Sequence, residues 1–143
     1  MTAPAILIVE DEIFVAIDIE RVLADAGYNV AAIAADRTEA LAAAPRAAMA
    51  FVDLNLRDGP TGPQLAHDLA KHNIKVIYVT ANPAQIEPAA ETAIGYIRKP
   101  FRDSAILNAA AVALQGVAPA DPDFIVFQAA NDALLQAGQR AVR

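Results

Sequence analysis

The sequence predicts a doubly wound α/β protein, in which a five-stranded parallel sheet carries helices on both of its faces. Two observations support this prediction. Short apolar runs rich in β-branched residues recur between Ile6 and Ile97, and segments with apolar residues at helical spacing lie between them. Strands that alternate with helices in this way are joined by crossovers, so neighbouring strands run parallel and the sheet is buried on both faces.

The first part of the chain contains two strands, which we expect at residues 6–9 and 28–34. Between them, residues 13–26 place apolar side chains at helical spacing. Gly27 suits the left-handed residue that often follows a helix end. A short alanine-rich helix comes next, and we expect Thr38 to cap its N-terminus.

Three further strands and two helices complete the predicted sheet. One helix is expected at about 63–72, with its proline in the first turn. The other runs to about Gln115, with Asp103 or Ser104 as its cap. The strands are expected at 48–52, 74–79 and 94–97.

The composition excludes several kinds of site. At 143 residues, the chain has the length of one domain with a sizeable core. Its net charge of -6 argues against a basic face that binds nucleic acid. The absence of cysteine excludes disulfides, thiolate metal sites and cysteine nucleophiles. Because the sequence has neither a signal-peptide pattern nor an apolar stretch of membrane-spanning length, we expect a cytoplasmic protein without membrane partners.

Polar side chains follow the predicted strands at the point where each strand ends. Glu10 and Asp11 follow the first strand, Asp53 the third, Thr80 the fourth and Lys99 the fifth. Each has a simpler interpretation alone, because Asp starts turns and caps helices, and Lys-Pro is a common surface pair. Together they meet at the carboxyl edge of a parallel sheet, where such folds bind ligands.

The residue types at this edge suit phosphoryl transfer. A carboxylate such as Asp53 can act as a nucleophile and form an aspartyl phosphate. Mg²⁺ prefers oxygen ligands, which Glu10, Asp11, Asp53 and the backbone carbonyl of Asn55 can supply. Lys99 adds a positive charge for the phosphate.

Two further features complete this predicted site. Thr80 supplies a hydroxyl donor beside the phosphate. Pro100 can form a cis peptide that directs Lys99 inward. The sequence has neither a G-x-G-x-x-G motif nor a P-loop, so nucleotide binding has no support.

The chain resembles the receiver domain of bacterial two-component response regulators. The resemblance covers about residues 4–116 and rests on four motifs, which are ILIVEDE at 6–12, FVDLNL at 51–56, VIYVTAN at 76–82 and GYIRKPF at 95–101. It implies a flavodoxin-like fold with strand order 2-1-3-4-5. It also implies that the protein takes a phosphoryl group from a histidine kinase or a histidine phosphotransfer protein, and then signals by binding an unknown partner or serves as a phosphorelay shuttle or sink.

The resemblance also implies a role for each site residue. Asp53 matches the phosphoacceptor, and Lys99 matches the lysine that pairs with the phosphate. Thr80 matches the switch hydroxyl, and Tyr96 the aromatic residue whose rotamer couples to it. The remaining positions concern the metal: Glu10 and Asp11 match the acidic pair that holds Mg²⁺, and Asn55 the backbone ligand.

The chain departs from most receivers between Thr80 and Lys99. This segment is about one helical turn shorter than usual and contains Pro83 and Pro88. We therefore expect a short or irregular fourth helix. Receivers with this feature and a loop like LNLRDGPTG are similar to stand-alone regulators that work with alphaproteobacterial sensor kinases.

Residues 117–143 form an extension to the receiver domain, which we expect at residues 1–116. The extension contains a linker, an apolar patch at 124–127 and a helical pattern after it, and is too short for an output domain of its own. Because the patch is too apolar to stay in water, we expect it to dock on its own domain or on a second copy in a two-fold dimer.

Two other functions share part of this pattern. One is a pseudo-receiver that binds partners without phosphorylation, but the complete set of acids, Thr80 and Lys99 argues against it. The other is a phosphatase of the haloacid-dehalogenase type, which also uses an aspartate nucleophile and Mg²⁺. That chemistry needs a second carboxylate two residues after the first, where this chain has Asn55.

Overall fold

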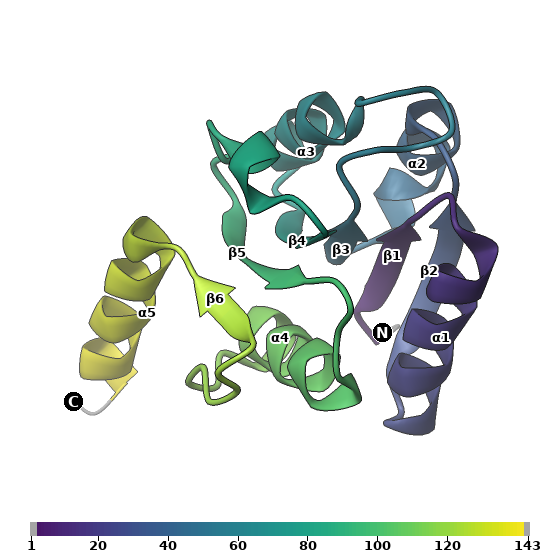
Figure 1. The fold of residues 1–143 in the computed structure, drawn as a ribbon. Coiled ribbons are helices and arrows are strands. Elements are labelled where there is room, and N and C mark those ends of the chain that lie inside the picture. The colour runs from purple at the N-terminus through teal and green to yellow at the C-terminus, as the bar shows by residue number, and fades with distance from the viewer. Residues whose placement is uncertain (1–2, 142–143) are drawn as a thin grey trace.

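A computed structural model describes residues 3–141 and confirms the predicted α/β fold (Figure 1). The sheet has six strands in the order β2-β1-β3-β4-β5-β6. The first five are parallel in the order 2-1-3-4-5, and the sixth is antiparallel to β5. The strands are β1 (Ala5–Val9), β2 (Asn29–Ala34), β3 (Met49–Val52), β4 (Lys75–Thr80), β5 (Ala93–Arg98) and β6 (Phe124–Val126).

Helices cover both faces of this sheet, and each covered face has its own apolar core. The α-helices are α1 (Ile13–Asp25), α2 (Arg37–Ala43), α3 (Gly62–Lys71), α4 (Asp103–Gln115) and α5 (Gln128–Ala141), with 3-10 turns at Ala44–Arg46 and Pro83–Ile86. Helices α1 and α4 pack on one face, and α2 and α3 on the other. No helix in the described residues is long and apolar enough to cross a bilayer.

Alternation along β1 shows why its sequence is continuously apolar. Ile6 and Ile8 belong to the core under α1 and α4, whereas Leu7 and Val9 belong to the core under α2 and α3. Successive side chains of a strand point to opposite faces, and here both faces are covered. A strand in this position therefore has no polar face.

Two helix caps differ from the predictions. Asp36, not Thr38, caps α2, because its side chain accepts a hydrogen bond from Glu39 N at 2.9 Å. Neither Asp103 nor Ser104 caps α4, whose N-cap residue is Arg102 and has no side-chain cap hydrogen bond. The carboxylate of Asp103 instead pairs with Arg21 at 3.4 Å, and the hydroxyl of Ser104 lowers the pKa of the Asp121 carboxyl.

The connection between β4 and β5 contains only the 3-10 turn at Pro83–Ile86, which confirms the expected shortened helix. The side chains of this connection are nevertheless held against the sheet. Ile86 and Ala90 are buried, and Ala90 N donates to the hydroxyl of Tyr78 at 3.0 Å. Thr92 Oγ1 donates to Ile74 O at 2.6 Å.

The extension docks back on its own domain, which is one of the two predicted alternatives. Helix α4 ends at a left-handed Gly116, and the chain returns to the sheet as β6. Strand β6 pairs with β5 so that Gly95 lies opposite Val126. Phe124 is buried by this pairing, and α5, which contacts β5, lies beyond β6 at the edge of the sheet (Figure 1).

Candidate functional site

The buried polar residues of the described chain all lie at one edge of the sheet. They are Glu10, Asp53 and Thr80, which follow or end β1, β3 and β4. Because these strands are parallel and adjacent, their carboxyl ends meet at the same edge. Burying a charged or polar group is costly unless it is paired. The free-energy cost of burying polar side chains therefore falls mainly at this edge of the sheet.

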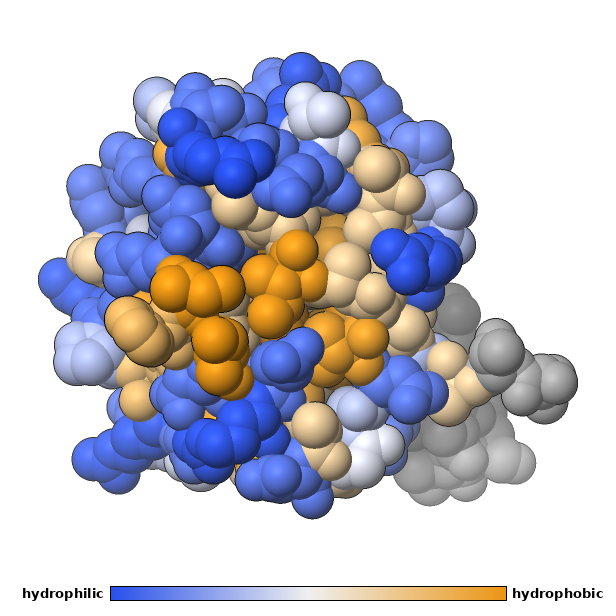
Figure 2. Space-filling view, turned by 90° about the vertical axis from the view of Figure 1, so that its right-hand side faces the viewer, coloured by the Kyte–Doolittle hydropathy of each residue, from blue (hydrophilic) through white to orange (hydrophobic). Residues whose placement is uncertain are grey.

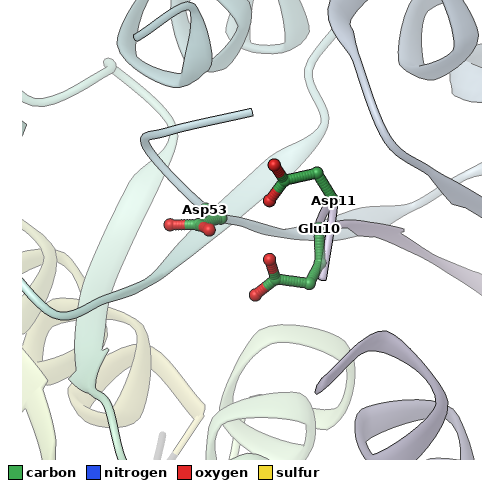
Figure 3. A group of neighbouring side chains, drawn as sticks. All are labelled: Glu10, Asp11 and Asp53. Carbon is green, nitrogen blue, oxygen red and sulfur yellow. The ribbon is translucent and has the colours of Figure 1, made fainter. Parts of the chain in front are cut away.

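Three carboxylates converge at this edge, as Figure 3 shows. One oxygen each from Glu10, Asp11 and Asp53 lies within 4.8 Å of the other two. Glu10 and Asp53 are buried, while Asp11 is exposed. Hard cations prefer carboxylate oxygens, and one or two carboxylates with water suffice for an octahedral ion. The donor set therefore fits a divalent cation.

The environment of Glu10 shows the electrostatic strain that such a cation relieves. Burial raises the pKa of Glu10 to about 7, and the negative charge of Asp53 acts in the same direction. The hydrogen bonds that Glu10 forms with Lys99 and with the backbone of Glu12 oppose this rise. Carboxylates at this spacing repel one another when they are ionised together. A bound cation removes this repulsion.

Lys99 pairs with two of these carboxylates. Its ammonium bonds to Glu10 and lies 3.1 Å from Asp53 Oδ2. Burial alone lowers the pKa of Lys99, but the hydrogen bond to Glu10 and the charges of both acids raise it overall. The side chain therefore stays positively charged beside Asp53. The Lys99–Pro100 peptide is cis, which agrees with the sequence interpretation.

The backbone fixes Asp53 at the end of β3. Asp53 N donates to Val9 O at 2.9 Å, and Leu54 N donates to Asp53 Oδ1 at 2.8 Å. Gly62, the first residue of α3, lies directly against this segment, and a Cβ atom there would be 2.2 Å from Asp53 O. Sequence reasoning missed Gly62 as a site residue, and the only available signal was a glycine in a loop rich in glycine and proline.

The other predicted residues lie nearby in different settings. Thr80 Oγ1 accepts a hydrogen bond from Asn82 N at 2.9 Å. Tyr96 is half-buried on β5, and its ring centroid is 6.0 Å from that of Phe127. Asn55 is exposed, and its Nδ2 donates to Gln85 Oε1 at 3.1 Å. The role of its backbone carbonyl as a metal ligand stays a prediction.

The sequence is similar to that of known proteins. Residues 6–111 match the family described as the response regulator receiver domain. The chain is 34% identical over 120 residues to the phyllosphere-induced regulator PhyR of Methylorubrum extorquens, an alignment that covers 80% of this chain and 44% of that protein. The chain thus spans less than half the length of this curated relative.

Solved structures give the same result. The solution structure of the Erythrobacter litoralis PhyR receiver domain matches with a TM-score of 0.71 and 27% identity, and covers 80% of this chain and 92% of that one. A CheY-like receiver domain from Methanospirillum hungatei JF-1 matches with a TM-score of 0.69 and 28% identity, and covers 80% and 95%. By sequence and by fold, the chain belongs to the response regulator receiver domain family.

Proposed function

We propose that Asp53 accepts a phosphoryl group from a phosphohistidine of a sensor kinase or a histidine phosphotransfer protein. The observation that carries this proposal is the position of Asp53 between Lys99, 3.1 Å away, and the acidic pair Glu10 and Asp11. Phosphoryl transfer depends mainly on positioning and on charge stabilisation. This arrangement supplies both around a single carboxylate.

In the proposed reaction a carboxylate oxygen of Asp53 attacks the phosphorus atom. The bond between phosphorus and the donor's imidazole nitrogen breaks, and the nitrogen keeps the electron pair. Leu54 N orients the Asp53 carboxylate through its hydrogen bond to Oδ1. The Lys99 ammonium then moves its hydrogen bond from Asp53 to a phosphoryl oxygen, and Thr80 can donate its hydroxyl hydrogen to another.

The metal in this proposal is Mg²⁺, held by Glu10, Asp11, Asp53 and the backbone carbonyl of Asn55. The chemistry it supplies when bound is neutralisation of charge on the phosphoryl oxygens. The acidic residues alone would repel an incoming phosphoryl group, and Lys99 offsets only part of their charge. We therefore expect phosphorylation to require the cation.

The entrance to the site has an apolar surface that suits a protein donor. Ile13, Phe14 and Ile17 on α1 are exposed, and Phe14 is 85% exposed. A hollow of about 680 Å³ leads from Phe14 to Lys99. Figure 2 shows an apolar patch on the side of the molecule where α1 lies. We propose that the phosphohistidine domain docks here.

The proposed output is phosphorylation-dependent binding of a downstream protein, or transfer of the phosphoryl group along a relay, in the cytoplasm. The chain would catalyse only its own phosphorylation and dephosphorylation.

A small phosphodonor tests the proposal without a cognate kinase. The full chain is incubated with Mg²⁺ and acetyl phosphate, and intact mass is measured. We expect one added phosphoryl group, none without Mg²⁺, and none on Asp53→Asn. Asp25→Asn, at an exposed carboxylate at the end of α1, is the matched control and should be phosphorylated normally. Phosphorylation of Asp53→Asn would contradict the assignment.

A further inference from the structure

The extension contacts β5, and the site lysine, Lys99, directly follows this strand. Phe127 packs its ring against Tyr78 and Tyr96, with centroid distances of 6.3 Å and 6.0 Å. Its backbone N donates to Ile94 O at 2.9 Å. Strand β6 pairs with β5 immediately before it. We call residues 124–131, which contain β6, Phe127 and the start of α5, the strap.

The strap fills a place that the shortened connection leaves open. Between β4 and β5 the chain forms only the 3-10 turn at Pro83–Ile86, on the face where α2 and α3 pack. Phe127 joins the core of that face beside Tyr78, which is fully buried. Aromatic rings contribute large apolar areas when buried together. The strap is thus part of the receiver core.

Strand β5 is adapted to receive the strap. A Cβ atom on Gly95 would lie 2.1 Å from Ile125 O and 3.0 Å from the ring of Phe124. Any side chain at this position would therefore displace β6. The close approach of β5 and β6 depends on glycine at position 95, so the sequence of β5 is compatible with docking of the strap.

The chain leading into the strap also approaches the site. A hollow of about 510 Å³ is lined on one side by residues of β5 and the loop after it, including Tyr96 and Lys99. Its other side is lined by Pro122, Asp123 and Ile125. Lys99 N donates to Thr80 O at 2.9 Å, so the end of β5 is fixed to the end of β4. The strap and the site therefore meet at one element, β5 together with the lysine that follows it.

We propose that docking of the strap opposes phosphorylation of Asp53, and that Tyr96 and Phe127 form the coupling contact; this inference rests on the proposed function. The strap packs on β5 in the arrangement in which Lys99 bonds to Glu10 and Asp53. Under the proposed function, Lys99 and Thr80 would bond to phosphoryl oxygens instead, and because Lys99 directly follows β5, this exchange of partners would move the end of that strand. Docking favours the arrangement in which Lys99 bonds to Glu10 and Asp53. The phosphoryl group therefore lowers the equilibrium constant for docking, and docking lowers the affinity for the phosphoryl group or its analogue by the same factor.

Hydrogen exchange of the full chain, with and without Mg²⁺ and beryllium trifluoride as the phosphoryl analogue, tests the coupling directly. We expect the analogue to raise exchange in residues 124–131 by at least about fivefold, the lower end of ordinary coupling factors. The amide of Phe127, which donates to Ile94 O, is the most informative position. Unchanged or slower exchange in the strap with the analogue bound would overturn the proposal.

Affinity for the analogue gives the reciprocal measurement. Phe127→Ala removes the ring, and Gly95→Ala displaces β6 from the opposite side of the same contact, so both should bind the analogue at least about fivefold more tightly than the unmodified chain. Val117→Ala, at an exposed side chain before the strap, is the matched control and should not change the affinity.

Equal affinity in Phe127→Ala, Gly95→Ala and the unmodified chain would refute the strap while leaving phosphorylation intact. Failure of the unmodified chain to bind the analogue at all would instead refute the proposed function, and the strap with it.

Discussion

Lys99 Nζ lies 3.1 Å from Asp53 Oδ2, although 46 residues separate the two in the sequence. The contact links the ends of β3 and β5 across β4, which lies between them in the sheet. The contact joins Asp53, the candidate nucleophile, to a positive charge. Among the described residues, Lys99 is the cation that forms ion pairs with both Glu10 and Asp53. The effect of this contact on Mg²⁺ affinity can be measured separately from its effect on the rate of phosphorylation.

Replacing Lys99 by glutamine should impair phosphorylation more than metal binding. A hydrogen bond to a charged group contributes about 1.5–3 kcal/mol, so we expect phosphorylation by acetyl phosphate to slow about 10- to 100-fold. Mg²⁺ affinity should stay the same or rise, because a competing cation has left the carboxylates. Lys71→Gln, at an exposed lysine of α3, should change neither value. A large loss of Mg²⁺ affinity in Lys99→Gln would show that Lys99 positions the metal ligands instead.

Binding of Mg²⁺ should depend on pH around neutrality. Since burial raises the pKa of Glu10 to about 7, protons compete with the cation at this carboxylate. We expect apparent Mg²⁺ affinity to rise between about pH 6 and pH 8 and to level off above that, with proton release on binding near pH 7. Calorimetry in buffers of different ionisation enthalpy measures both. In Glu10→Gln the pH dependence should disappear, whatever affinity remains.

Without metal, the same group should make the protein less stable as pH rises from about 4.5 to about 7. The folded state holds the Glu10 proton more tightly than the unfolded state, so unfolding releases a proton throughout this window and the free energy of unfolding falls with rising pH. Thermal melts in a chelator should show this decline, and added Mg²⁺ should reverse it at pH 8. Glu10→Gln should lack this component of the decline.

Gly62→Ala should disturb the phosphoacceptor loop without removing a site side chain. The added Cβ would lie 2.2 Å from Asp53 O and 2.4 Å from the Cα of Leu54, and such overpacking costs about 1–3 kcal/mol. We expect a lower denaturant midpoint together with slower phosphorylation of Asp53. Thr61→Ala, one residue earlier, removes only a hydrogen bond to the exposed Asp58 and should retain normal phosphorylation. Full activity and stability in Gly62→Ala would contradict the proposed close packing.

Tyr78→Phe should loosen the connection between β4 and β5. The change keeps the buried ring but removes the oxygen that accepts a hydrogen bond from Ala90 N. An unsatisfied buried amide costs about 1–3 kcal/mol, so we expect lower stability and faster hydrogen exchange at residues 81–92. Tyr96→Phe, a half-buried ring on the neighbouring strand, is the matched control and should retain slow exchange at Ala90. Equal exchange in both variants would rule out this anchor.

The sheet and the polar edge could be predicted from the sequence because both follow from local patterns and one topological rule. Apolar runs identify buried strands, and parallel strands bring their carboxyl ends together. Glu10, Asp53 and Thr80 therefore lie together as expected. The proximity of Lys99 to Glu10 and Asp53 follows from the same rule, because β5 ends at the same edge of the sheet.

The features that were missed depend on contacts between distant segments. Strand β6 has three residues and is defined by its pairing with β5, so local periodicity identifies its apolar character but not its partner. Gly62 matters because α3 begins against Asp53. Asp36 and Thr38 are both residue types that can cap a helix, so only the hydrogen bond from Glu39 N identifies Asp36 as the cap of α2.

The short tether between α4 and β6 has a thermodynamic consequence for assembly. Residues 117–123 connect β6 to the end of α4, so β6 reaches the edge of β5 as an intramolecular ligand. Short flexible tethers give effective concentrations in the millimolar range. For equal intrinsic affinity, the same segment from a second molecule at about 1 µM would be outcompeted about a thousandfold. A dimer formed by exchanging extensions between copies therefore requires protein concentrations that approach the millimolar range.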